Sequence, residues 1–388
     1  MKFTQSIFAA AFAFAAAAAF AAPVTTQGVG VGKHGDIQVA VTFDNGKIQK
    51  IDILKNAENP VLAKKVFTDL KDQIVAANSV QLDGISGATF TSKGLFAAVE
   101  DAAKKAGVTL GQADKKALKA AVKDLPKDAS YDVVVIGAGG AGFSAAIEAK
   151  NAGATVVLLE KMPQVGGNSL ISGAEMNAAK NWVQPKLGIT DDSPELHAKD
   201  TYLGGDKKGD MKVINVMTHN ALAGAEWCRD YLGVRFEPDN LFFFGGHSRK
   251  RALIPVGHTG TEFITKFQAK ADELGIPVIT NMKAEELIKD KSGRVVGVKA
   301  TMNGAEYTFN AKGGVVLATG GFGANPAMVK KYNPKIDERF KTTDAPGTTG
   351  EALYMAQRAG AELVNMQYIQ TYPICDPISG VIELIADA

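Results

Sequence analysis

This chain has little cysteine and no clear excess of either charge, and each of these features excludes a class of protein. Its 388 residues include only two cysteines, Cys228 and Cys375. Two cysteines cannot supply a disulfide framework or the four thiolates of an iron–sulfur cluster, and these two lie too far apart for a C-x-x-C-H haem attachment site. The 43 lysines and arginines are balanced by 41 aspartates and glutamates. This balance argues against a nucleic-acid partner, which usually requires a clear basic excess.

Long apolar runs are confined to the start of the chain. Residues 1–21 contain one lysine, then an uncharged stretch rich in Ala and Phe, and end in a small-x-small pattern, which is typical of a cleaved secretory signal peptide. The apolar run from Ile7 to Ala21 has 15 residues, fewer than the roughly 20 that span a bilayer. We therefore expect export, cleavage and a periplasmic location.

Residues 22–110 are expected to form a small α+β domain. Apolar and polar residues alternate from Ile37 to Phe43, as in a half-buried strand. Asn45-Gly46 then precedes a second β-rich run, which is the signature of a hairpin. Apolar residues recur at every fourth position over residues 62–77, which predicts an amphipathic helix, and residues 95–106 predict another.

A larger domain is expected over residues 130–364, joined to the first by a lysine-rich, solvated linker at residues 111–129. It opens with the apolar run Val133–Ile136, which suits a strand buried on both faces. Further strand candidates, which alternate with helical segments, are Val156–Leu159, Val278–Ile279 and Val315–Leu317. This alternation predicts a doubly wound α/β sheet. Residues 365–388 are expected to begin a further domain.

A loop rich in glycine and hydroxyl groups, Asp83–Ser92, lies before the second predicted helix of the small domain. From its residues alone it is either an anion cradle made of open backbone N–H groups or a capped helix start. Its pattern D-G-x-S-G-A-T resembles the flavinylation motif of the FMN-binding domain family, in which a threonine carries FMN through a phosphoester bond. The resemblance implies covalent FMN at Thr89, attached by a flavin transferase after export.

A dinucleotide site is predicted where the first strand of the larger domain ends. Gly137, Gly139 and Gly142, with Ala138 among them, form G-x-G-x-x-G between a strand and a helix. The three glycines allow a tight turn, close approach of a pyrophosphate and helix–strand packing. Glu160 follows the next strand, where an acid binds a ribose hydroxyl. Taken alone, this pattern is compatible with NAD as well as FAD.

Three later segments resemble the flavoprotein subunits of fumarate reductase and succinate dehydrogenase. They are the loop with Lys161, Gly166, Gly167, Asn168 and Ser169, the segment with Thr319, Gly320 and Gly321, and residues 366–370. The chain is identified as a member of the soluble, periplasmic branch of the fumarate reductase flavoprotein family. The resemblance implies a Rossmann-like domain that holds non-covalent FAD through the first two of these segments and the dinucleotide loop. It also implies that residues 365–388 start the family's capping domain.

The expected substrate depends on Glu175, Tyr372 and Asp387. The family transfers a hydride from reduced FAD to an α,β-unsaturated carboxylate. Fumarate reductases place a carboxylate-binding histidine where this chain has Tyr372 and usually a glycine where it has Glu175, and a carboxylate there repels a dianion. The three residues resemble the substrate set of urocanate reductases, because acids keep an imidazole protonated. Urocanate reduction to imidazole propionate is therefore predicted, with fumarate, methacrylate and cinnamate-type enoates as alternatives.

The resemblance places the proton-donating arginine, a substrate-binding histidine and a further arginine beyond Ala388. No catalytic residue is therefore assigned in this chain, which we expect to be truncated. Electrons are expected to pass from an external donor, such as a periplasmic or membrane-linked redox protein, to FMN, then FAD, then substrate. A non-catalytic flavin electron carrier or sensor is the alternative of another class. No metal site is expected, and His247 and His258 are interpreted as structural.

Overall fold

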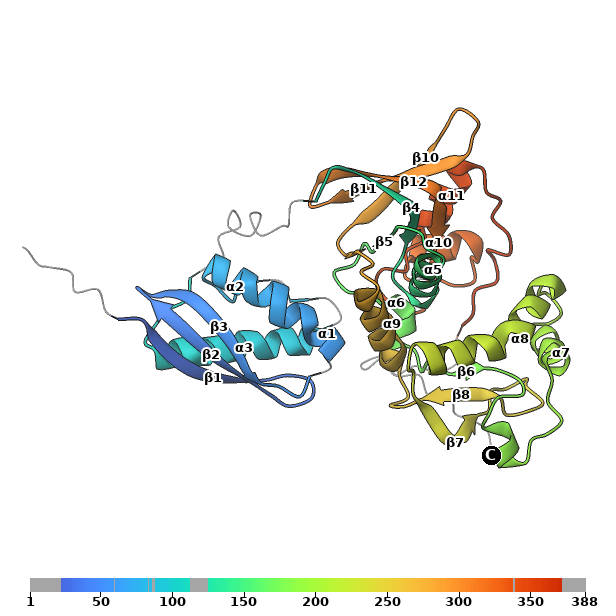
Figure 1. Cartoon of the computed structure of the whole chain (residues 1–388), viewed down its shortest axis with the longest axis horizontal. Coiled ribbons are helices and arrows are strands. Elements are labelled where there is room, and N and C mark those ends of the chain that lie inside the picture. The colour runs from blue at the N-terminus through green and yellow to red at the C-terminus, as the bar shows by residue number, and fades with distance from the viewer. Residues whose placement is uncertain are drawn as a thin grey trace, which may run out of the picture. The chain divides into compact units, whose positions relative to one another are not determined.

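The computed structural model describes residues 22–58, 60–82, 84–85, 88–111, 125–337 and 339–371 (Figure 1). The predicted signal peptide, most of the predicted linker, and Tyr372 and Asp387 lie outside these ranges. The chain divides into two compact units, residues 1–122 and 123–388, each described here by itself. Within the described ranges, no helix combines the length and the apolar character that crossing a membrane requires.

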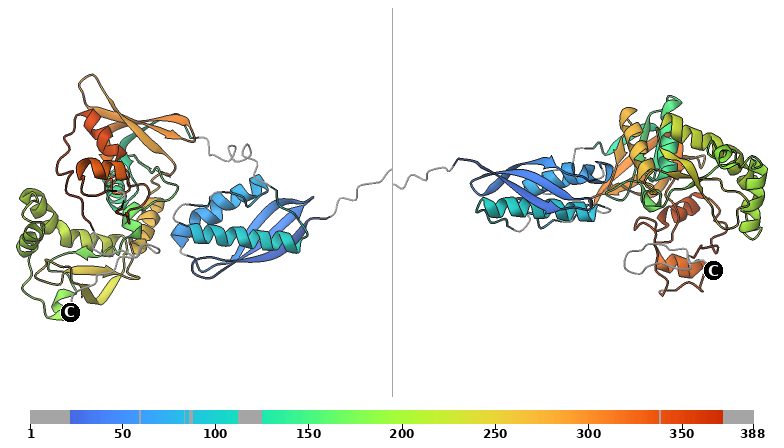
Figure 2. Two further views of the ribbon diagram at one scale, coloured as in Figure 1. Left: turned by 180° about the vertical axis from the view of Figure 1, so that it is seen from behind. Right: turned by 90° about the horizontal axis from the view of Figure 1, so that it is seen from below.

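The first unit packs helices against one antiparallel sheet. Its strands pair in the order β1 (Val24–Val31), β2 (Asp36–Asp44) and β3 (Lys47–Lys55). Figure 2 shows the long helix α3 (Thr89–Lys105) lying along this sheet. The helical stretch between β3 and α3 consists of α1 (Pro60–Lys65), the π-helical turn η1 (Val66–Leu70) and α2 (Lys71–Ala77).

The predicted hairpin is confirmed, and its turn explains the choice of residues. Asn45 and Gly46 have φ values of 49° and 74°, as the two central residues of a type I′ turn require. The strand β1 escaped prediction because glycines occupy two of its inward positions. A side chain at Gly28 or Gly30 would overlap the backbone of α3, so close packing against the helix removes the apolar residues that mark a strand.

The second unit contains a six-stranded sheet with a parallel centre, which confirms the predicted α/β class. The strand order is β10-β11-β12-β4-β5-β9, with β12, β4, β5 and β9 parallel. Their bounds are β4 Asp128–Ile136, β5 Val156–Leu159, β9 Val278–Ile279, β10 Lys283–Lys289, β11 Val295–Met302 and β12 Ala305–Leu317. The antiparallel extension β10–β11 was not predicted.

Helices cover the central sheet on both faces. Val134 and Val157 pack in one cluster with α11 (Glu351–Ala359), while the alternate residues Val135 and Leu158 are also fully buried. The helix α5 (Gly140–Asn151) lies against β4 and β5 and packs on α9 (Thr261–Glu273). Because β12, β4 and β5 are parallel, their carboxyl ends share one edge of the sheet.

A second, unpredicted sheet lies within the same unit (Figure 1). Its order is β6 (Met176–Asn177), β8 (Ala252–Pro255) and β7 (Phe236–Phe242), all antiparallel. The remaining elements are α6 (Gly167–Ile171), η2 (Gln184–Leu187), α7 (Pro194–Gly204), α8 (Met211–Glu226), η3 (Trp227–Tyr231) and α10 (Pro326–Tyr332). Because β6 follows Glu175 directly, this sheet holds the chain beside one predicted site residue.

Candidate functional site

The glycine-rich loop forms a cradle at the carboxyl end of β4. A side chain at Gly142 would overlap the carbonyl oxygen of Gly137, and one at Gly137, whose φ is 103°, would overlap the Ala318 carbonyl. These two glycines are needed for packing. At Gly139, by contrast, an added Cβ would meet no atom closer than 3.6 Å. Gly139 is thus not required for packing, and its place before the first turn of α5 suits a pyrophosphate, since backbone N–H groups and the helix dipole favour an anion there.

Glu160 follows β5 and lies beside that cradle. Its Oε2 accepts a hydrogen bond from the Ala138 N–H (2.9 Å) and its Oε1 accepts one from the Met162 N–H (2.8 Å). Each oxygen keeps a second lone pair. The carboxylate is therefore fixed at the sheet edge and can still accept a ribose hydroxyl, as FAD requires.

The two later segments predicted to hold FAD, residues 161–169 and 319–321, meet at this cradle. The Ser169 hydroxyl accepts a hydrogen bond from the Gly140 N–H (3.1 Å), and the Gly166 N–H donates to the Ala138 carbonyl (2.8 Å). The backbone at residues 318–319 packs against Gly137. The side chain of Asn168 bonds to residues 344 and 345 of a later loop. The second dinucleotide segment, with Thr319, Gly320 and Gly321, thus follows β12 at the same edge as the first.

Lys161 connects two of these segments. Its ammonium group donates to the Thr349 hydroxyl and, at 2.8 Å, to Oε2 of Glu351 at the start of α11. Partial burial alone would raise the pKa of Glu351. The hydrogen bonds from Lys161 and Thr349 outweigh this effect and lower the pKa to about 2. The ammonium group of Lys161 thus links its own loop to the segment with Thr349 and Glu351. Its contact with FAD stays a prediction.

Buried amides of two residues beside this region have no partner. Both amide atoms of Gln164, four residues after Glu160, and Oδ1 of Asn177 in β6 are buried without a hydrogen bond. Buried polar atoms are nearly always satisfied, so a bound molecule or water must complete these positions. Neither residue was predicted, because an isolated amide carries no sequence signal. The glycine cradle with the Glu160 carboxylate beside it fits a bound dinucleotide.

Glu175 lies in the loop that leads into β6. Its half-buried carboxylate folds over Gly173, and it makes no hydrogen bond or ion pair with any residue that the structure describes. The preceding residue, Ala174, has a φ of 57°, a left-handed conformation that costs a non-glycine residue about 1–3 kcal/mol. Such strain persists where the surroundings over-determine the backbone. The grouping of Glu175 with Tyr372 and Asp387 stays a prediction.

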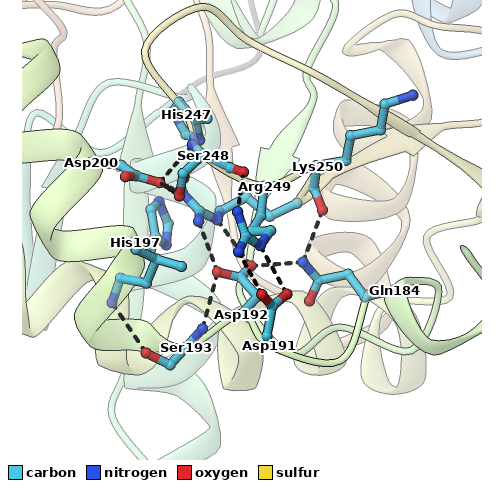
Figure 3. Close-up of polar contacts among 12 residues, drawn as sticks. Gln184, Asp191, Asp192, Ser193, His197, Asp200, His247, Ser248, Arg249 and Lys250 are labelled. Atoms are coloured by element: carbon cyan, nitrogen blue, oxygen red, sulfur yellow. Dashed lines mark hydrogen bonds and ion pairs between the residues drawn. The ribbon is translucent and has the colours of Figure 1, made fainter. Parts of the chain in front are cut away.

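A network of polar contacts joins residues around Asp192, Asp200 and His247 (Figure 3). Arg251, which precedes β8, is fully buried and pairs with Asp192 and Asp200, each at 2.7 Å. Its carbonyl accepts hydrogen bonds from the Ala178 N–H (3.0 Å) and the Asn181 amide (3.2 Å). The network therefore fixes the backbone on which the Glu175 loop ends.

Two histidines belong to the same network. Burial, followed by the charge of Arg251, lowers the pKa of His197 to about 4 and also lowers that of His247. Both rings are thus neutral at pH 7. His247 is part of this packed network, in agreement with its structural interpretation. The side chain of His258 is largely exposed, and its Nε2 lies 3.8 Å from Oε1 of Glu237. In the described part of the chain, no group of three or more His, Cys, Asp or Glu could hold a metal ion.

In the first unit, Thr89 is the first residue of α3, where the flavinylation motif enters the helix. Directly before it, the Ala88 N–H donates to the Ile85 carbonyl (3.0 Å). The next residue, Phe90, is 65% exposed. The predicted attachment residue thus starts a regular helix beside an exposed aromatic side chain.

Comparisons with known proteins agree with this geometry. Residues 132–385 match the FAD binding domain family, and residues 32–104 match the FMN-binding domain family. The chain is 42% identical over 365 residues to a urocanate reductase of Eggerthella lenta, covering 93% of this chain and 59% of that protein. It is 36% identical over 270 residues to a fumarate reductase (cytochrome) of Shewanella frigidimarina, covering 69% of this chain and 46% of that protein.

A solved structure supports the same relationship. The open conformation of a flavocytochrome c3 fumarate reductase matches with a TM-score of 0.62 and 31% identity, over 71% of this chain and 48% of that one. This chain thus spans about three fifths of the urocanate reductase and under half of these fumarate reductases. The chain belongs to the FAD-binding family of the fumarate reductase and succinate dehydrogenase flavoproteins, and its residues 32–104 match the FMN-binding domain family.

Proposed function

We propose that the protein is a flavin-dependent reductase of an α,β-unsaturated carboxylate, and that its substrate is urocanate, which it reduces to imidazole propionate. The observation that carries the proposal is the carboxylate of Glu175, which has no partner among the residues that the structure describes and follows the strained residue Ala174. The similarity to a urocanate reductase along most of this chain supports it. Bound FAD supplies the hydride, and the residues of this chain orient and select the substrate.

The charge of Glu175 favours a cationic head group over a second carboxylate. Two unit charges about 4 Å apart interact by about 4 kcal/mol at an effective dielectric constant of about 20. A protonated imidazole gains this energy beside Glu175, whereas the second carboxylate of fumarate loses it. A positive ring also withdraws electrons from the conjugated alkene, which eases hydride attack on the alkene carbon.

The FMN-binding domain suggests the route by which electrons enter. We place covalent FMN on Thr89, loaded by a flavin transferase, between an external donor and FAD. The amino-terminal segment supports export to the periplasm, where the donor is a periplasmic or membrane-linked redox protein. Mass spectrometry of mature protein from the periplasmic fraction tests both points, because cleavage after Ala21 and a flavin on the Thr89 peptide give distinct masses.

The substrate assignment is tested with the full-length protein. Oxidation of a reduced viologen dye should be faster with urocanate than with fumarate. Glu175→Gln should lower kcat/KM for urocanate by about tenfold to a thousandfold, the effect of losing part or all of a charge interaction of this size. Flavin content should not change. Glu195→Gln, which neutralises an exposed carboxylate on α7, is the matched control.

Two results would contradict the assignment. A clear preference of the wild-type protein for fumarate would show that the pocket accepts a dianion. Equal kinetics of Glu175→Gln and the wild type would remove Glu175 from the site and leave an enoate reductase of undefined substrate. A loss of flavin from Glu175→Gln would indicate a structural role instead.

A further inference from the structure

A buried carboxylate lies in the first unit beside the start of α3. The side chain of Glu58 is only 2% exposed. Its Oε1 accepts a hydrogen bond from the His34 backbone N–H (2.8 Å), and its Oε2 accepts one from the Thr91 hydroxyl. A side chain at Gly32 would overlap the carboxylate, so the turn between β1 and β2 leaves room for it.

Keeping this acid ionised inside a small domain is costly, since removing a carboxylate from water is expensive unless it is paired or hydrogen-bonded. Burial alone would raise the pKa of Glu58, yet the bonds from His34 and Thr91 lower it. An apolar residue would fill the same space at no such cost. Glu58 faces the imidazole of His34 (Nδ1–Oε2 3.7 Å) and thus links the β1–β2 turn to Thr91, which lies two residues after Thr89.

The two hydroxyl residues that follow Thr89 and Phe90 are both buried and bonded. Thr91 donates to Glu58, as described above. The Ser92 hydroxyl accepts a hydrogen bond from the Ile85 N–H (3.0 Å) and donates to the Ala88 carbonyl (3.0 Å). The backbone on each side of Thr89 is thus tied to the core. We call Glu58, Thr91 and Ser92 the attachment frame.

The frame also sets which face of α3 position 89 occupies. Residues two apart on an α-helix are separated by about 200° around the axis. With Thr91 directed inward to Glu58, position 89 lies on the opposite side of the first turn. The intervening residue, Phe90, is largely exposed, as expected when the inward side of this turn is taken by Thr91.

We propose that Glu58 is a positioning residue for the attachment of FMN, acting through Thr91 to hold the first turn of α3 so that Thr89 is presented to the flavin transferase. This rests on the proposed attachment at Thr89. In the transfer from FAD, the Thr89 hydroxyl oxygen forms a bond to the phosphorus of the FMN half. The pyrophosphate bond breaks, AMP leaves, and the hydroxyl proton passes to the transferase. Glu58 makes and breaks no bond in this step.

The test measures the rate of flavin attachment to the full chain. Flavin-free protein is incubated with a purified flavin transferase and FAD, and intact mass is followed with time. Thr91→Val removes the hydroxyl at nearly constant size, Thr91→Ser restores it, and Glu58→Gln removes the charge. Thr68→Val is the matched control, because Thr68 is exposed on η1 outside the frame. Thr89→Ala defines the background.

We expect Thr91→Val and Glu58→Gln to slow attachment by about tenfold or more, the effect of losing a hydrogen bond to a charged acceptor. Thr91→Ser and Thr68→Val should react at the wild-type rate. Hydrogen exchange of the peptide spanning residues 84–95 should be faster in the slow variants, with the rest of the unit still protected.

Other outcomes overturn the inference. One is a folded Thr91→Val that is modified at the wild-type rate, and another is a Thr91→Ser as slow as Thr91→Val. Loss of exchange protection throughout the unit in both Thr91→Val and Glu58→Gln would show a purely structural role. If the wild-type chain acquires no flavin at all, the proposed attachment at Thr89 fails, and this inference fails with it.

Discussion

Replacing Asp192 by asparagine should destabilise the FAD-binding unit far more than the same change at its neighbour Asp191. Both aspartates form two-point pairs with an arginine, Asp192 with Arg251 and Asp191 with Arg249. The first pair is buried, with exposed side-chain fractions of 0% and 1%. The second is open to solvent, at 36% and 64%. Asp191 and Asp192 thus form the same kind of aspartate–arginine pair, one exposed to solvent and one buried.

The magnitude follows from what the Asp192 carboxylate supports. Besides two bonds from Arg251, it accepts hydrogen bonds from the Gln184 amide (2.7 Å) and the Ser193 N–H (3.0 Å). Asparagine directs an N–H group at one of these donors and leaves the buried guanidinium with Asp200 alone. Removing one partner of a buried pair costs about 3–5 kcal/mol, whereas an exposed pair contributes about 0–1 kcal/mol.

The assay is thermal unfolding followed by tryptophan fluorescence. The two tryptophans of the chain, Trp182 and Trp227, both lie in the second unit, so the signal reports this unit alone. For a domain of this size, each kcal/mol shifts Tm by about 2–4 °C. Asp192→Asn should therefore lower Tm by about 6–20 °C and Asp191→Asn by less than about 4 °C. Equal shifts in the two variants would refute the assignment of Arg251 as a buried anchor.

Three further predictions concern the same unit. Gly142→Val should abolish FAD binding, measured as the non-covalent FAD that denaturation releases from purified protein, because its side chain would overlap the Gly137 carbonyl; releasable FAD at the wild-type level would contradict the packing role of this glycine. The pKa of Glu351 is lowered to about 2, so the Tm advantage over Glu351→Gln should be constant above pH 5 and vanish as pH falls toward 2. The pKa of His197 is lowered to about 4, so folding should weaken between pH 6.5 and 4, less so in His197→Asn; identical pH profiles would refute the buried neutral ring.

The parts of the site that were predicted are those encoded by neighbouring residues. A strand, three glycines and an acid after the next strand follow one another within residues 133–160, and the structure brings them to one sheet edge. The hairpin at Asn45 was predictable for the same reason, since its φ above zero restricts the residue choice locally. Local geometry leaves a local pattern in the sequence.

The anchor of the Glu175 loop had no such pattern. The partners of Arg251 lie 51 and 59 residues away in the chain, and each looks like an ordinary solvated charge in the sequence. Only the apolar run that follows Arg251 hints at burial. The buried amides of Gln164 and Asn177 could not be predicted from the sequence either, because burial without a hydrogen-bond partner arises from tertiary packing alone.

The buried Arg251 network supplies the constraint that holds the strained Glu175 loop. Ala174 holds a left-handed φ, a conformation worth about 1–3 kcal/mol in strain, and Glu175 has no described partner to offset it. Pairing of β6 with β8 and the bonds from residues 178 and 181 to the Arg251 carbonyl supply the opposing constraint. Asp192→Asn should thus raise KM for urocanate at temperatures where the unit is still folded and loaded with flavin. An unchanged KM would show that the loop is held independently of the buried charges.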